Sequence, residues 1–146
     1  MLAFGTPAIN ACEAAEQLNG VLRVGVWDAR FAKPVDVSLV TSLVERGIPI
    51  LTIEDHSIVG GFGSAVLEAA HEAGLSQAVI VRHGLPDRWV LQDSRARQLA
   101  EVELDTPGIV RLVAAVANGS ASEGRDESRM RVRVTPRATQ HKPARR

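Results

Sequence analysis

Residues 52–66 read Thr-Ile-Glu-Asp-His-Ser-Ile-Val-Gly-Gly-Phe-Gly-Ser-Ala-Val, and they carry more structural information than any other part of the chain. The apolar run 48–53 that leads into them predicts a strand buried on both faces. An acidic loop with one histidine follows, and three glycines then lead into a helix. A buried strand, a polar loop and a helix in this order are typical of a parallel α/β domain.

The rest of the chain repeats the order of strand and helix. Expected strands are 2–4, 21–26, 48–53 and 78–81. Expected helices begin at Thr6-Pro7, Asp36, Gly63-Ser64, Asp93-Ser94 and Thr106-Pro107, where capping residues or a first-turn proline stand. Such alternation predicts an α/β fold of three layers, a mainly parallel sheet with helices on both faces.

The first helix is predicted to bury one apolar face. Ile9, Cys12, Ala15 and Leu18 recur every three residues. Cys12 is the only cysteine, so no disulfide can form within the chain, and we interpret it as a small core residue. The chain shows no signal peptide and no apolar run of about 18 residues, which favours a cytoplasmic protein without membrane contact.

Charge is distributed unevenly although the formal net charge is zero. Residues 1–117 hold 9 Lys/Arg against 14 Asp/Glu, and residues 118–146 hold 8 against 3. We therefore predict a folded domain over 1–117 and a disordered basic tail over 118–146. A basic tail can contact nucleic acid phosphates, but this one lacks interleaved aromatic residues, so a solvated extension is favoured and nucleic acid is not the expected partner.

The loop at Glu54, Asp55 and His56 is the first candidate site. It follows a parallel strand, at the edge where open α/β sheets bind ligands. A carboxylate beside an imidazole can transfer protons, and the helix after Gly60 and Gly61 can attract an anion. The alternative, which we favour, is a loop whose charges face solvent or a neighbouring domain.

Arg30 and Lys33 form a second candidate site around Phe31. They can hold a phosphate or a carboxylate of a partner. The favoured alternative is that Arg30 pairs with a nearby acid and Phe31 packs beneath it. We predict no catalytic residue, no cofactor-binding residue and no metal ligand in the chain, since no fingerprint with the required spacing is present.

Four motifs follow one another in the order of a known family. They are Asp28-Ala29-Arg30-Phe31-Ala32-Lys33-Pro34-Val35-Asp36, Glu54-Asp55 with Gly60-Gly61, Gly84-Leu85-Pro86-Asp87, and Leu104-Asp105-Thr106-Pro107-Gly108-Ile109. Together they resemble the C-terminal domain of 1-deoxy-D-xylulose-5-phosphate synthase, a thiamine-diphosphate-dependent member of the transketolase family. The resemblance covers nearly all of residues 1–117.

The resemblance implies a supporting α/β domain. In the whole family enzyme, two larger domains bind thiamine diphosphate and Mg²⁺ and condense pyruvate with glyceraldehyde 3-phosphate, releasing CO2. The present sequence has no Gly-Asp-Gly motif with a following asparagine, so we expect this chain to bind neither cofactor. The expected partners are a chain that carries the thiamine-diphosphate domains, or a second copy of this chain.

Three hypotheses remain open from the sequence. The chain is the C-terminal piece of a split synthase, or an orphan fragment without activity, or a small module that binds an anion or nucleic acid. Family members begin the first strand several residues earlier, so we expect a truncated or split gene product. In each case Arg30, Lys33, Glu54, His56, Gly60 and Gly61 are the candidate interface or anion-loop residues.

Overall fold

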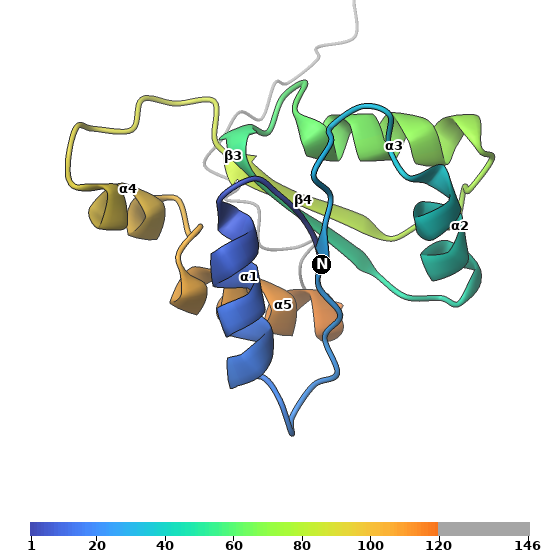
Figure 1. The fold of residues 1–146 in the computed structure, drawn as a ribbon, viewed down its shortest axis with the longest axis horizontal. Helices are drawn as coiled ribbons and strands as arrows, with labels where there is room; N and C mark the ends of the chain where they lie inside the picture. Colours follow the sequence, from blue (N-terminus) through green and yellow to red (C-terminus); the bar gives the residue numbers. More distant parts are fainter. Residues whose placement is uncertain (120–146) are drawn as a thin grey trace, which may run out of the picture.

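The computed structural model describes residues 1–119 (Figure 1). In chain order the elements are β1 (Leu2–Phe4), α1 (Pro7–Gln17), β2 (Trp27–Asp28), α2 (Val37–Glu45), β3 (Ile50–Ser57), α3 (Phe62–Glu72), β4 (Ile80–Leu85), α4 (Arg95–Glu101) and α5 (Thr106–Ala117). The predicted basic tail lies outside the described residues, apart from 118 and 119.

The four strands form one parallel sheet in the order β2-β1-β3-β4. β1 lies between β2 and β3, and Leu2 is opposite both Trp27 and Thr52. β3 and β4 pair over a longer stretch, with Ile50 opposite Ile80. All four strands therefore end at the same edge, which we call the carboxyl edge of the sheet.

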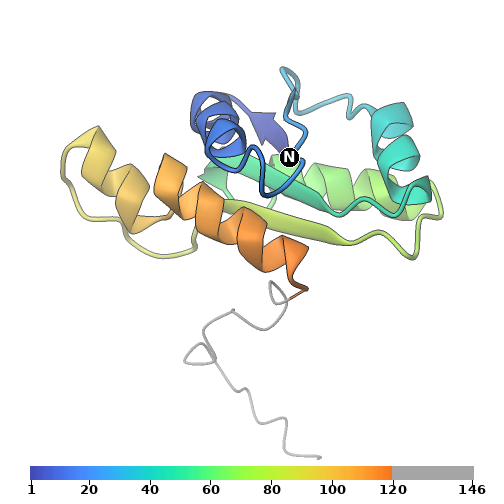
Figure 2. The same ribbon diagram turned by 90° about the horizontal axis from the view of Figure 1, so that it is seen from below.

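Helices cover both faces of this sheet, as the sequence predicted. Figure 1 shows α1 and α5 on one side of the strands and α2 and α3 on the other. Figure 2 shows α4 beside the beginning of α5, at the end of the molecule away from α2. Successive residues of β1 point to opposite faces of the sheet. Leu2 packs with α2 and α3, and Ala3 packs with α1 and α5.

The buried face of α1 differs from the prediction. Ala11 and Ala14 are fully buried, whereas Ile9 is 67% exposed and Cys12 is exposed too. Each step of three residues falls about 60° short of a full helical turn, so a series from 9 to 18 spreads across half the helix surface. The small alanine side chains face the sheet and let α1 pack closely against it, so Cys12 is not a core residue.

Three of the strands lie further along the chain than predicted. β2 is Trp27–Asp28 rather than 21–26, and these two residues pair with Leu2 and Ala3 of β1. β3 continues to Ser57, so Glu54, Asp55 and His56 belong to a strand rather than to a loop. β4 likewise continues from Ile80 to Leu85.

Most helix starts were predicted correctly. Asp36 Oδ1 accepts a hydrogen bond from the Leu39 amide at 2.9 Å, and Ser94 and Asp105 cap α4 and α5 in the same way. Thr6 precedes α1 without a capping bond, and its hydroxyl donates to Asp55 Oδ2 instead. Within residues 1–119, no helix is both long and apolar enough to cross a membrane.

Substitutions of two isoleucines, one buried and one exposed, test which residues form the core. Ile109 is fully buried in α5 and Ile9 is 67% exposed in α1. We expect Ile109→Ala to lower the free energy of unfolding by about 2–5 kcal/mol, because it leaves a cavity. Ile9→Ala is the control and should change it by less than about 0.5 kcal/mol. Urea denaturation measures both, and equal losses would contradict the assigned face of α1.

Candidate functional site

Glu54 lies at the centre of the candidate site and is fully buried. Its Oε2 accepts a hydrogen bond from the Phe62 amide at 2.6 Å, and its Oε1 accepts one from the Gly63 amide at 2.8 Å. These are free amides of the first turn of α3, where the helix dipole favours negative charge. The anion at this helix terminus is therefore the protein's own carboxylate.

Glycines make room for this carboxylate. A Cβ at Gly61 would lie 2.1 Å from Glu54 Oε2 and 2.2 Å from the Ser57 carbonyl oxygen. A Cβ at Gly84, on the neighbouring strand β4, would lie 2.8 Å from Glu54 Cγ. Both positions therefore require glycine because of the close approach of Glu54.

The loop between β3 and α3 is held by a second set of contacts. Arg82 Nη1, from β4, donates to the Ile58 carbonyl at 2.9 Å and to Ser64 Oγ at 2.8 Å. Ser64 Oγ also accepts from the Gly60 amide at 3.1 Å. Gly60 has a φ of +71°, which glycine adopts without strain. Gly60 and Gly61 thus form a fixed turn around Glu54.

Asp55 and His56 do not join Glu54 in one catalytic group. Successive side chains of a strand alternate between its faces. Asp55 lies on the side of α1 and α4, where it accepts from Thr6 Oγ1 at 3.3 Å and forms an ion pair with Arg95. His56 is exposed near the end of β3. The two oxygens of the Glu54 carboxylate accept from amides of α3, so Asp55 and His56 do not form an acid–base pair with it.

Arg30 and Lys33 lie in the loop that follows β2. The Arg30 amide donates to Asp28 Oδ1 at 3.1 Å, and its guanidinium lies 3.7 Å from Asp28 Oδ2. This is the local pairing that the sequence favoured. Phe31 does not pack beneath it and is 68% exposed, so that part of the prediction was wrong. Lys33 is also exposed.

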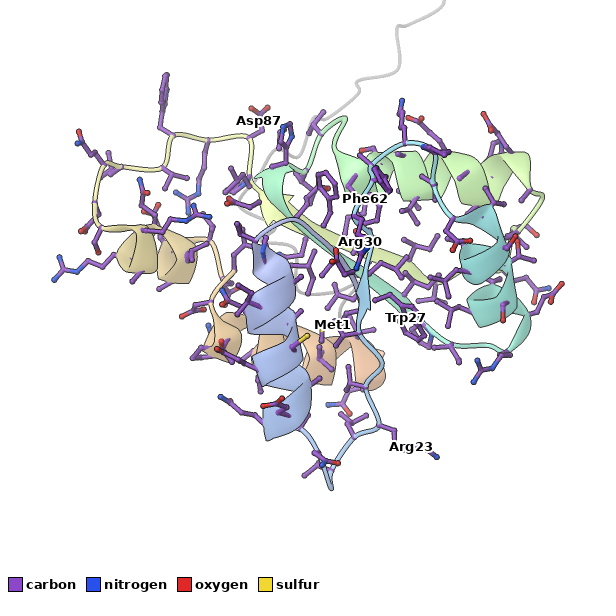
Figure 3. The ribbon with its side chains drawn as sticks, in the orientation of Figure 1. Met1, Arg23, Trp27, Arg30, Phe62 and Asp87 are labelled. Carbon is purple, nitrogen blue, oxygen red and sulfur yellow. The ribbon has the colours of Figure 1, made fainter. Side chains whose placement is uncertain are left out.

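The carboxyl edge carries large exposed apolar side chains in addition to these charges. They follow three different strands: Phe31 after β2, Val59 after β3, and Trp89 and Leu91 after β4. Trp89 is 92% exposed. Figure 3 shows Asp87, in the loop after β4, at the far end of the molecule from Arg23. We call Phe31, Val59, Trp89 and Leu91 the apolar rim.

His83 links β4 to the turn before α5. Its Nε2 lies 3.1 Å from the Glu103 carbonyl oxygen. Burial lowers the pKa of His83 below its usual 6.5, and the nearby Glu103 carbonyl and carboxylate oppose this shift. The sequence did not single out His83, and it did not reveal the role of Arg82. Arg82 follows the apolar run 78–81 directly. A cationic residue at such a position in a strand indicates a buried polar partner, and this pattern could have identified Arg82 from the sequence.

The described residues do not fit thiamine diphosphate with Mg²⁺. Residues 1–119 contain no group of three or more His, Cys, Asp or Glu side chains that could hold a metal ion. At the glycine-rich start of α3, the amides of Phe62 and Gly63 already donate to the Glu54 carboxylate, so they are not free to bind a diphosphate. We therefore derive no reaction step through that cofactor from this part of the chain.

The parallel sheet order and its two helical layers define a three-layer α/β domain of the transketolase C-terminal type. A family model described as "Transketolase, C-terminal domain" matches residues 1–109, and the chain belongs to this family. A solved structure titled "Split gene transketolase, inactive beta4 tetramer" matches with a TM-score of 0.66 and 30% identity, covering 82% of this chain and 38% of that one.

Curated relatives narrow the likeness further. The chain is 49% identical over 111 residues to 1-deoxy-D-xylulose-5-phosphate synthase of Geobacillus sp. (strain WCH70), covering 75% of this chain and 18% of the relative. It is 50% identical over 106 residues to the synthase of Geobacillus thermodenitrificans (strain NG80-2), covering 71% and 17%. The chain thus spans about a fifth of the length of these relatives.

The Glu54 contact is testable by one substitution. Glu54→Gln replaces one acceptor oxygen by a donor that faces an amide, so we expect a loss of about 2–3 kcal/mol of unfolding free energy. Glu68→Gln, on the exposed side of α3, is the control and should be nearly neutral. Chemical denaturation compares them, and a neutral Glu54→Gln would disprove the structural role.

His83 predicts a pH dependence of stability. Its pKa is lower in the folded protein than in the unfolded chain, so the unfolded chain binds more protons near and below pH 6.5. Stability should therefore fall as the pH falls through 6.5, until His83 also protonates in the folded protein. His83→Gln should reduce this fall, and His71→Gln, on α3, should not. Thermal melts between pH 7.5 and pH 5 measure the difference.

Proposed function

We propose that this chain acts as the C-terminal domain of a 1-deoxy-D-xylulose-5-phosphate synthase, a cytoplasmic transferase that supplies precursors of isoprenoids and thiamine. The observation that carries the proposal is 49% identity to such a synthase over 111 residues, which nearly coincide with the described domain. In the whole enzyme, pyruvate and glyceraldehyde 3-phosphate condense with loss of CO2. Thiamine diphosphate and Mg²⁺ are held by the other domains of that enzyme.

A supporting role agrees with how the polar residues are used. Glu54 holds the start of α3, Asp55 pairs with Arg95, and Arg82 holds the loop after β3. Each of these groups is engaged in a contact that stabilises this domain. The chain then contributes position and surface to catalysis, and it is inactive by itself.

The apolar rim is the proposed contact with the thiamine-diphosphate domains. Its four exposed side chains follow the ends of three strands at one edge of the sheet, and large exposed apolar side chains are common at interaction sites. Arg30, Lys33 and His56 lie at the same edge and supply polar contacts around it. By analogy with the split-gene transketolase, an inactive beta4 tetramer, the proposed partner is a separate chain carrying the catalytic domains, and the alternative partner is a second copy of this chain.

Reconstitution tests the proposed function. Mixing the chain with the protein that carries the thiamine-diphosphate domains should produce synthase activity, measured as CO2 release from pyruvate that depends on glyceraldehyde 3-phosphate. Val59→Asp at the rim should weaken association about tenfold, which corresponds to 1.4 kcal/mol. Val79→Asp is the matched control, because Val79 is 58% exposed at the opposite end of the sheet.

Two outcomes would contradict the proposal. The first is that no association and no gain of activity are seen with the unaltered chain, which would favour an orphan fragment. The second is that the chain alone releases CO2 from pyruvate. Equal weakening by Val59→Asp and Val79→Asp would contradict the assignment of the rim alone.

A further inference from the structure

The outer edge of β4 is a long, open edge of the sheet. β4 is the last strand in the order β2-β1-β3-β4, and within residues 1–119 it pairs with β3 only. It extends over six residues, from Ile80 to Leu85, and none of them is a proline, which would lack an amide to donate. An edge of this kind can pair with one further strand.

The backbone of β4 directs hydrogen-bonding groups toward this outer edge. Ile50 lies opposite Ile80, and its amide donates to the Val79 carbonyl at 2.9 Å. In a parallel pair of strands, one residue bonds to both neighbours of the residue opposite it, so Val79 and Val81 face β3. The peptide groups of a strand alternate in direction, and Ile80 and Arg82 therefore direct their amides and carbonyls away from β3.

One stretch of the predicted basic tail has the sequence pattern of a strand. Residues 129–135 read Arg-Met-Arg-Val-Arg-Val-Thr, and Pro136 follows them. Arginine and apolar residues alternate from 129 to 134, which is the pattern of a strand with one apolar face. Valine and threonine favour extended backbone, and proline is typical of a strand end. These residues lie outside the described part of the chain, and their pattern matches what an open strand edge can accept.

Opposite charges favour contact between this stretch and the domain. Residues 1–117 hold 9 Lys/Arg and 14 Asp/Glu, whereas residues 118–146 hold 8 and 3. Such attraction draws the tail toward the domain but does not select a position on it. The open amides and carbonyls of β4 supply that selection. The arginine of β4, Arg82, donates to the Ile58 carbonyl and to Ser64 Oγ, so its guanidinium is directed into the loop after β3.

The chain between α5 and this stretch is long enough to reach either end of β4. α5 ends at the amino end of the sheet, where Ala117 and Ile50 line the same groove. Residues 120–128 span up to about 30 Å when they are extended. β4 itself is about 20 Å long. Length therefore permits both directions of pairing.

The hand of the connection selects between these directions. α3 joins β3 to β4 on one face of the sheet, and α5 lies on the other face. A strand added outside β4 and parallel to it would therefore be reached by a crossover of the opposite hand to β3–α3–β4. Parallel crossovers are right-handed in nearly all proteins. An antiparallel strand is not subject to this rule.

We propose that residues 129–135 pair with the outer edge of β4 as an antiparallel strand and extend the sheet to five strands. Their apolar side chains then lie beside Val81 and Leu85, which pack on the core under α1 and α5, and their arginines lie on the opposite face. The added strand protects the edge from pairing with other chains. This inference goes beyond the proposed function and does not depend on it.

Hydrogen exchange of single amides in the full chain, followed by NMR, tests the pairing. Ile80 and Arg82 should exchange about tenfold more slowly in the unaltered chain than after Val132→Pro, because proline breaks the added strand. Ala138→Pro, outside the alternating stretch, is the control and should leave their exchange unchanged. The Val81 amide faces β3 and should exchange equally in all three proteins. Equal exchange of Ile80 and Arg82 in all three would overturn the proposal.

A spin label tests the direction and the origin of the added strand. It is attached through Arg129→Cys in the chain bearing Cys12→Ser, which removes the native thiol. An antiparallel strand places the label near Leu85, so the Leu85 amide should broaden more than the Ile80 amide, and the reverse order would overturn the arrangement. Broadening that disappears on dilution with unlabelled chain would identify a second copy as the occupant, which would also overturn the proposal.

Discussion

The contact between the Glu54 carboxylate and the first turn of α3 determines how the centre of this domain is built. A buried carboxylate is costly unless its oxygens are satisfied, and here two helix amides satisfy them. This contact fixes the last fully buried residue of β3 and the first residue of α3. It also requires the loop between them to pass close to the Glu54 carboxylate. It also explains why Gly61 and Gly84 surround the carboxylate, since a Cβ at either position would collide with it.

This contact makes the two ends of the sheet physically different. At the carboxyl edge, internal hydrogen bonds satisfy Glu54 and hold the loop at Ile58, and the apolar rim faces outward together with the exposed charges of Arg30 and Lys33. At the opposite end, a groove beside the start of β1 has mainly apolar walls that include Leu22, Val24 and Val113. The carboxyl edge is therefore the end suited to docking against a formed polar and apolar surface.

The sequence predicted the parts of this fold that depend on local chemistry. Capping by Asp36 and Ser94 and the order of strands and helices follow from neighbouring residues. The start of α5 was predicted to within one residue, since Asp105 caps it and Thr106 is its first residue. The predictions that failed depend on partners distant in the sequence. Glu54 looks like a loop residue until the amides eight and nine residues later are placed beside it. The inward face of α1 is set by close packing against the sheet, which favours alanine over the larger Ile9.

A domain that contributes position rather than chemistry needs a rigid link between its contact surface and its core. The parallel sheet supplies this link, because Phe31 and Val59 follow strands whose residues lie in the buried core. The contacts of Glu54 and Arg82 hold the loop that carries Val59. A surface that is already ordered loses little conformational entropy on association, so a modest contact is enough to fix the orientation of the domain.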